Sequence, residues 1–264
     1  MLKNITLGQY YPADTLIHRL DPRTKMIILV ALLVTIFVVD TFYAFAVIAI
    51  FLAAVTLASH VGVKTVLRGV RPLLFIIIFT FVLNVLFYTG DNILFEWGII
   101  KISVEGIEKA VFIAIRLLLL VIATSLLTLT TSPMQITDGM ESMFGPLKKI
   151  RVPVHEMAMM MSIAMRFIPT LIDETDRIMK AQTARGAEFD SGNIFKKAKG
   201  LIPLLVPLFV GAFKRADELA LAMESRCYRG GEGRTRMKVL VMQKIDAGAL
   251  AICGAMCVLL CIFL

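Results

Sequence analysis

The stretch from Ile107 to Thr131 reads IEKAVFIAIRLLLLVIATSLLTLTT and decides the class of fold. Beyond Lys109 it carries one charged residue, Arg116, and it is long enough for the roughly 20 residues that an α-helix needs to cross a bilayer. Four other apolar runs accompany it: Met26–Val39, Phe42–Ser59, Leu73–Tyr88 and Ala247–Leu264. We therefore predict an all-α integral membrane protein with about five transmembrane helices.

The composition excludes other classes. Of the 264 residues, 58% are hydrophobic and 18% are charged, and the mean hydropathy is +0.81. A soluble domain usually has about 45–50% apolar and about 25% charged residues. Disordered, collagenous and ordinary soluble proteins are therefore excluded. Three of the four cysteines lie in the last apolar run, which is not the pattern of a disulfide framework.

Two Xaa-Pro pairs predict where helices begin. The first apolar run reaches a spanning length only if its helix starts near Pro22. Asp21-Pro22 suits that start, because Asp caps free amides and Pro fits the first helical position. In the same way, Arg71-Pro72 predicts a sharp beginning of the third, shorter run.

The distribution of Lys and Arg orients the spans. Eighteen of the 28 basic residues lie between Pro133 and Asp246, and three more lie in the short segment between the second and third runs: Lys64, Arg68 and Arg71. The positive-inside rule then places the N-terminus and this long insertion in the cytoplasm. The predicted organisation is a four-span membrane domain (1–131), a cytoplasmic domain (132–246) and a final transmembrane helix (247–264). The connection at 89–106 is too short for a domain and is predicted to be an external hairpin, in which the weak alternation of polar and apolar residues does not predict strands.

The insertion contains two predicted helices. Apolar residues recur at helical spacing from Met157 to Thr183, and Pro169 is expected to kink that helix rather than to end it. Leu201–Phe213 is almost wholly apolar, but at about 1.5 Å per residue it reaches only roughly 20 Å, short of a bilayer core of about 30 Å. It is better explained as the first part of an amphipathic helix that continues to Ser225.

The ends of these two helices repeat each other. The first reads DRIMKAQTARG (Asp176–Gly186) and the second DELALAMESRC (Asp217–Cys227). In both, an arginine in the last turn follows a small residue and is favoured by the negative end of the helix dipole. Its guanidinium fork suits a carboxylate or backbone carbonyls on a partner. One such tip is most often only a basic helix cap, but two matching tips favour a partner-binding site.

These tips resemble the paired Ala-Arg-Gly motifs of the transmembrane T component of energy-coupling factor (ECF) transporters. The segment His18–Lys25, which reads HRLDPRTK, and Arg166-Phe167-Ile168-Pro169 are also similar to that family. The resemblance covers nearly the whole chain. The second tip departs from the strict motif, because it reads Ser225-Arg226-Cys227.

The resemblance implies a non-catalytic scaffold with two kinds of partner. Two ABC-type ATPase subunits, expected as a heterodimer, would hydrolyse ATP. The scaffold would couple this hydrolysis to reorientation of a small membrane-embedded S component during uptake of vitamins or other micronutrients. ATP and Mg²⁺ would bind to the ATPases, with no cofactor or metal in this chain and no nucleic-acid partner. The location implied is a prokaryotic cell membrane. The ATPases would contact Ala184, Arg185, Gly186, Ser225, Arg226 and Cys227. The S component, one at a time and possibly interchangeable, would contact Met157, Met160, Met161, Ala164, Leu201, Leu204, Leu205 and Leu208.

Other signals favour structural roles. Arg116, inside the fourth run, is expected to snorkel or to bond carbonyls or Asn84, because no Asp or Glu lies mid-span. Cys253, Cys257 and Cys261 form one helical column and are expected to be small apolar packing residues. His155-Glu156 begins a zinc-protease-like pattern, but the next ligand position is Met159, so no metal site is predicted.

The alternative hypothesis is an autonomous secondary carrier or channel, and a membrane-bound enzyme is third. A carrier usually shows repeats across its spans and polar residues at the bilayer midplane. Here the repeat lies in the cytoplasmic insertion, and the missing mid-span carboxylates argue against proton or sodium coupling. The three histidines, His18, His60 and His155, form no evident catalytic group.

Overall fold

The computed structural model describes residues 10–88, 93–97, 100–150, 152–187, 194–230 and 240–263. They belong to two compact units. One, called the membrane unit below, contains the described residues up to Ser142 and from Leu240 onward. The other, called the helix-pair unit, contains the described residues from Met143 to Gly230. This division rests on contacts within the chain, so the predicted boundaries at 131/132 and 246/247 stay a prediction.

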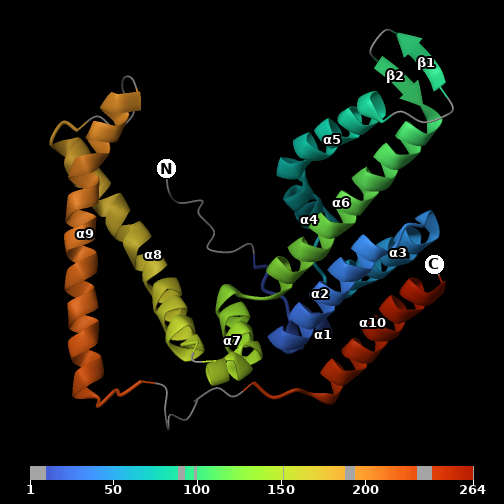
Figure 1. Ribbon diagram of the computed structural model, residues 1–264. Helices are drawn as coiled ribbons and strands as arrows, with labels where there is room; N and C mark the ends of the chain where they lie inside the picture. The colour runs from blue at the N-terminus through green and yellow to red at the C-terminus, as the bar shows by residue number, and fades with distance from the viewer. Residues whose placement is uncertain are drawn as a thin grey trace. The chain divides into compact units, whose positions relative to one another are not determined.

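The membrane unit is built around one long helix, α6 (Val104–Thr130). It packs against α2 (Pro22–Val38), α3 (Phe42–Ala58), α4 (Val63–Val70) and α5 (Leu74–Phe87), and α10 (Lys244–Phe263) packs against α2 (Figure 1). The unit also contains α1 (Leu16–Arg19) and α7 (Pro133–Met143). Each of the five predicted apolar runs therefore coincides with a helix.

The start of α2 confirms the prediction made from Asp21-Pro22. Pro22 occupies the first turn, and the Asp21 carboxylate accepts a hydrogen bond of 2.9 Å from the Arg23 amide. Pro lacks an amide hydrogen, which the first turn of a helix does not need, and the Asp side chain satisfies one amide that the helix leaves open.

The prediction that the third helix starts sharply at Arg71-Pro72 is wrong. A continuous helical segment runs from Val63 to Phe87, in which a 3₁₀ turn (Arg71–Leu73) joins α4 to α5. Arg71 keeps helical dihedral angles. Pro72 has no amide hydrogen to donate, and the short 3₁₀ turn at this point tolerates the missing hydrogen bond. The basic residues of this segment consequently lie on a helix rather than in a loop.

Length and composition identify three helical segments that could cross a membrane: Val63–Phe87, Val104–Thr130 and Lys244–Ile262. The described chain is thus a helical membrane protein. Its α2 and α3 have 17 residues each. The described residues depart from the all-α prediction at an antiparallel hairpin of β1 (Ile93–Trp97) and β2 (Ile100–Ser103), in which Glu96 pairs with Lys101. These strands lie in the segment 89–106, where an external hairpin is predicted and strands are not.

The core of the membrane unit brings together α2, α3, α6 and α10. Ile36, Phe45 and Ile48 are almost completely buried in it. Cys253 and Cys257 also belong to this core, with their Sγ atoms 4.0 Å apart. These two thiols are packing residues, as predicted, whereas Cys261 is exposed.

Arg116 has a partner that the sequence did not suggest. Its Nη2 donates to the Val39 carbonyl at 3.0 Å and to Asp40 Oδ1 at 2.8 Å. The predicted bond to a carbonyl is confirmed, but Asn84 instead donates to the Thr80 carbonyl. Arg116 lies near the middle of the long helix α6, and this part of α6 is beside the C-terminal end of α2. Asp40 follows that end of α2, so its carboxylate lies within reach of the guanidinium.

α7 was not predicted, and it packs on the start of α2. A Cβ added at Gly139 would lie 3.1 Å from the Cβ of Pro22, so this glycine permits the close approach. The residues that follow α6 therefore remain part of the membrane unit up to Ser142.

The helix-pair unit contains a 3₁₀ segment (Gly145–Ile150), α8 (Val154–Ala184) and α9 (Ile194–Ser225). α8 continues through Pro169, as predicted, and α9 continues through Pro203 and Pro207 to Ser225. The two helices contact each other and run in roughly opposite directions, and they diverge toward the start of α8 and the end of α9 (Figure 1).

Candidate partner-binding tips and surfaces

The first predicted tip ends α8 in a Schellman motif. The Ala187 amide donates to the Gln182 carbonyl at 2.9 Å, and the Gly186 amide donates to the Thr183 carbonyl at 2.9 Å. Gly186 has a φ of +85°, the left-handed conformation that this motif requires and that glycine adopts without a steric cost. The guanidinium-bearing residue, Arg185, is the last residue before this turn.

The second tip has the same geometry. The Tyr228 amide donates to the Met223 carbonyl at 3.1 Å, and the Cys227 amide donates to the Glu224 carbonyl at 2.9 Å. Arg226 occupies the position of Arg185, and Cys227 has a φ of +58° in the position of Gly186. The similarity of the two sequences is therefore also a similarity of backbone structure.

A hydroxyl group keeps each tip narrow. Thr183 Oγ1 donates to the Met179 carbonyl at 2.8 Å, and Ser225 Oγ donates to the Ala222 carbonyl at 3.0 Å. These bonds fold the small side chains back onto their helices. All six predicted tip residues are exposed: Ala184, Arg185, Gly186, Ser225, Arg226 and Cys227.

The tips lie at opposite ends of the helix pair. Gln182 Nε2, next to the first tip, donates to the Pro203 carbonyl near the beginning of α9 at 3.5 Å. Met223, next to the second tip, lines a cavity together with Ile163 and Phe167 from the first half of α8. The antiparallel pairing thus places two equivalent cationic ends at opposite ends of the helix pair.

We expect the residue after each arginine to set the stability of its tip. Cys227→Gly should stabilise the second tip by about 1 kcal/mol, because glycine removes the cost of a left-handed residue. Gly186→Ala should destabilise the first tip by a similar amount, although no atom lies within 4 Å of the added Cβ.

Amide hydrogen exchange at Ala187 and Tyr228 measures these effects. Exchange at Tyr228 should slow in Cys227→Gly, and exchange at Ala187 should accelerate in Gly186→Ala. Each variant serves as the control for the other tip. Unchanged exchange in both variants would show that the left-handed residue does not limit the stability of the tips.

The residues predicted to face a membrane partner are mostly exposed. On α8, Met157, Met160 and Met161 are 57%, 58% and 48% exposed, and Ala164 is also exposed. On α9, Leu201 and Leu205 are exposed and Leu208 is half-buried. Leu204 is buried, so its side chain belongs to the packing of α9 rather than to its surface.

The exposed apolar face of α9 extends beyond the predicted leucines. It also includes Val206, Phe209, Val210 and Phe213, of which Phe213 is 70% exposed. The sequence of Leu201–Phe213 predicts an apolar segment, but it does not show which of its side chains face α8. The structure shows this, because the side chains that do not pack against α8 are exposed.

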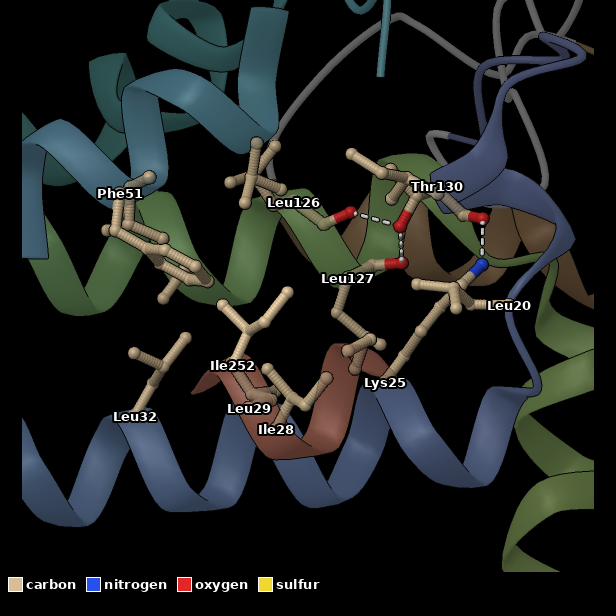
Figure 2. A pocket seen from close by; sticks show the side chains of 15 residues that line it. Leu20, Lys25, Ile28, Leu29, Leu32, Phe51, Leu126, Leu127, Thr130 and Ile252 are labelled. Atoms are coloured by element: carbon tan, nitrogen blue, oxygen red, sulfur yellow. Dashed lines mark hydrogen bonds between the residues drawn. The ribbon is translucent and has the colours of Figure 1, made fainter. Parts of the chain in front are cut away.

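The HRLDPRTK segment joins three helix ends in the membrane unit. The buried Lys25 Nζ donates to the His18 carbonyl at 3.2 Å and to the Thr130 carbonyl, at the end of α6, at 2.9 Å. Figure 2 shows Lys25 reaching Thr130 at the edge of an apolar cavity of about 260 Å³, which Leu29 and Ile252 also line. The lysine therefore ties the start of α2 to the end of α6.

Asp246 joins the third helix end and was missed by the sequence reasoning. One carboxylate oxygen accepts the Asp21 amide at 2.8 Å, and the other accepts the Gln243 amide at the start of α10 at 2.8 Å. The residue is 1% exposed. The sequence signal for this role is an Asp in the first turn of an apolar helix. The first amides of a helix have no acceptor within the helix, and a carboxylate placed there can accept their hydrogen bonds.

Both ring nitrogens of His18 lie within hydrogen-bond distance of partners in this junction. Burial lowers the pKa of its imidazole below the usual value of 6.5. Its Nε2 lies 3.0 Å from the Tyr11 carbonyl, which can only accept, so Nε2 donates there, and its Nδ1 lies 2.7 Å from Thr15 Oγ1. The histidine consequently fixes the segment before α2.

The geometry defines a helical membrane protein with two exposed arginine tips, at the ends of α8 and α9, and exposed apolar residues on both of these helices. These are the features of a protein that works by contact with other proteins. In the part of the chain that the structure describes, no group of three His, Cys, Asp or Glu side chains could hold a metal ion.

Comparison with known proteins identifies the family. Residues 13–237 match the CbiQ family, described as cobalt transport protein. The chain is 54% identical to the energy-coupling factor transporter transmembrane protein EcfT of Thermosediminibacter oceani, over 97% of each chain. It is 46% identical to the protein of the same name from Bacillus subtilis, over 95% of this chain and 94% of the relative.

The chain belongs to the CbiQ family, and it is a transmembrane component of an energy-coupling factor transporter. It is a non-catalytic subunit of that transporter. The family resemblance seen in the tips and in HRLDPRTK is thereby confirmed. The autonomous carrier, which was the alternative hypothesis, is replaced by a subunit of a larger complex.

Proposed function

We propose that the chain is the scaffold through which two ABC-type ATPase subunits, forming a heterodimer, drive a small S component in the membrane. The observation that carries this proposal is the pair of equivalent, exposed arginine tips at opposite ends of one antiparallel helix pair. Two equivalent contacts suit two related partners. Each guanidinium would bind a carboxylate or backbone carbonyls in a groove of one ATPase, and ATP with Mg²⁺ would bind to the ATPases alone.

The proposed topology has five spans, with the N-terminus and the helix-pair unit in the cytoplasm of a prokaryotic cell membrane. Lys25, Thr130 and Asp246 support it, because they bring together the start of α2, the end of α6 and the start of α10. These three ends lie on the cytoplasmic side in the proposed topology. The 17-residue α2 and α3 are at the lower limit of about 17–25 residues for a span.

The exposed apolar surfaces would hold the S component. Methionine side chains are flexible and polarisable, and they suit a surface that accepts several partners. Met157, Met160 and Met161 on α8 therefore favour one surface shared among interchangeable S components, of which one binds at a time. The transported substrate, a vitamin or another micronutrient, would be bound by the S component.

Purification of the tagged chain from its native cells in a mild detergent, followed by mass spectrometry, tests these partners. We expect two different ABC-type ATPases and one or more small membrane proteins in roughly equal amounts. Several small membrane proteins would support the shared surface. Purification without ATPases would contradict the proposed scaffold.

A further inference from the structure

One ion pair connects the two helices that bear the tips. Arg215 Nη2 on α9 lies 2.5 Å from Glu174 Oε2 on α8, and the two side chains are 31% and 24% exposed. Glu174 also lies against the backbone of α9, since a Cβ added at Gly211 would be 3.1 Å from Glu174 Oε1. The absence of a side chain at Gly211 lets the carboxylate reach across the interface.

The position of this pair relates it to both tips. Arg185 follows Glu174 by about three helical turns, and Arg226 follows Arg215 by about three turns. Because the helices are antiparallel, the two tips extend from the pair in opposite directions. The pair therefore lies midway between the two ends that would bind ATPases.

The other contacts between α8 and α9 are less directional. Phe167 and Leu171 face Ala216 and Leu219 around a cavity of about 290 Å³. Apolar contacts of this kind tolerate small rotations and shifts, because the attraction is non-directional and the cavity leaves room. The hydrogen bond between Gln182 and Pro203 is long, at 3.5 Å. The Glu174–Arg215 pair is a shorter polar contact between α8 and α9 than the Gln182–Pro203 hydrogen bond, and it joins opposite charges across the interface.

We propose that the Glu174–Arg215 ion pair is the pivot that joins α8 and α9 midway between the two arginine tips, so that movement of one tip is transmitted to the other. This inference rests on the proposed function. Glu174 and Arg215 would affect energy coupling by setting the positions of α8 and α9, so they are positioning residues. They are not themselves contacts for the ATPases.

The distance between the tips in the assembled complex tests this role. Spin labels at Lys180→Cys and Leu221→Cys, two exposed positions beside the tips, report that distance in a chain whose exposed thiols are removed by Cys227→Gly and Cys261→Ala. Pulsed electron paramagnetic resonance is recorded with and without a non-hydrolysable ATP analogue. ATPase content is measured on the same samples.

We expect one narrow distance distribution that shifts as a whole with nucleotide. Glu174→Gln and Arg215→Gln should retain the ATPases but at least double the width of the distribution. The charge-swapped variant E174R/R215E should restore a narrow distribution, because it restores an ion pair. If the two side chains only filled volume between the helices, the swap would not restore the narrow distribution. Asp173→Asn and Lys214→Gln change the charge of exposed neighbours and should leave the distribution unchanged.

Two results would overturn the pivot. Distributions as narrow as those of the unaltered chain in both Gln variants would show that the apolar contacts suffice. Loss of the ATPases from the Gln variants alone would make the pair part of the docking surface instead. Absence of ATPases from the unaltered chain is a different result, since it contradicts the proposed function itself.

Discussion

Replacing both tip arginines, as Arg185→Ala and Arg226→Ala together, should strip the ATPases from the purified chain and abolish uptake. Each truncation is expected to cost about 2–5 kcal/mol if the guanidinium pairs with a buried carboxylate in the complex, because the partner charge is then left without a counterion. Every 1.4 kcal/mol is about a tenfold change in affinity. The loss should therefore be large even for one arginine.

Quantitative mass spectrometry of the co-purified ATPases measures this effect. Both tips are exposed and their helix-ending hydrogen bonds involve only backbone groups, so the variant should reach the membrane in normal amounts. Arg177→Ala, an exposed arginine of α8 outside the tip, is the matched control and should keep its ATPases. Wild-type ATPase content and uptake in the double variant would contradict the role of the tips.

The second large effect is expected at the junction of the membrane unit. Asp246→Ala removes the acceptor of two backbone amides, those of Asp21 and Gln243, in a place where the carboxylate is 1% exposed. A buried donor left without a partner costs about 1–3 kcal/mol, so the total for the two amides should be about 2–6 kcal/mol. The starts of α2 and α10 should separate or fray as a result.

The midpoint of thermal unfolding in detergent measures this change. It should fall by several degrees in Asp246→Ala and by less in Asp246→Asn, which keeps one acceptor oxygen. Asp138→Ala, on α7 of the same unit, is a control whose carboxylate does not take part in this junction. If Asp246→Ala unfolded at the same temperature as the unaltered chain, the junction would not contribute to stability.

Local signals in the sequence predicted the helices and the tips well. Asp21-Pro22 fixed the start of α2, because capping depends only on neighbouring residues. Gly186 and the repeated spacing before Arg185 and Arg226 predicted two similar helix ends, and both have the same hydrogen bonds. The family assignment depended on these local motifs as well.

Features that depend on contacts between distant residues were not predicted. The continuation of α4 into α5 through Pro72 and the pairing of Arg116 with Asp40 both need the packed arrangement of helices. The exposed face of α9 could not be assigned before its pairing with α8 was known, which is why Leu204 was grouped with Leu205. An apolar run shows that a surface is hydrophobic without showing what it packs against.

In the proposed function, the two tips bind two ATPase subunits. A photo-crosslinking amino acid placed at Ala184 or, separately, at Ser225 tests it most directly in intact cells, with Met160 as the position predicted to face a small membrane protein. We expect a crosslink from each tip position to an ABC-type ATPase, with different subunits captured by the two tips, and a crosslink from position 160 to an S component. Tip positions that capture no ATPase would contradict it.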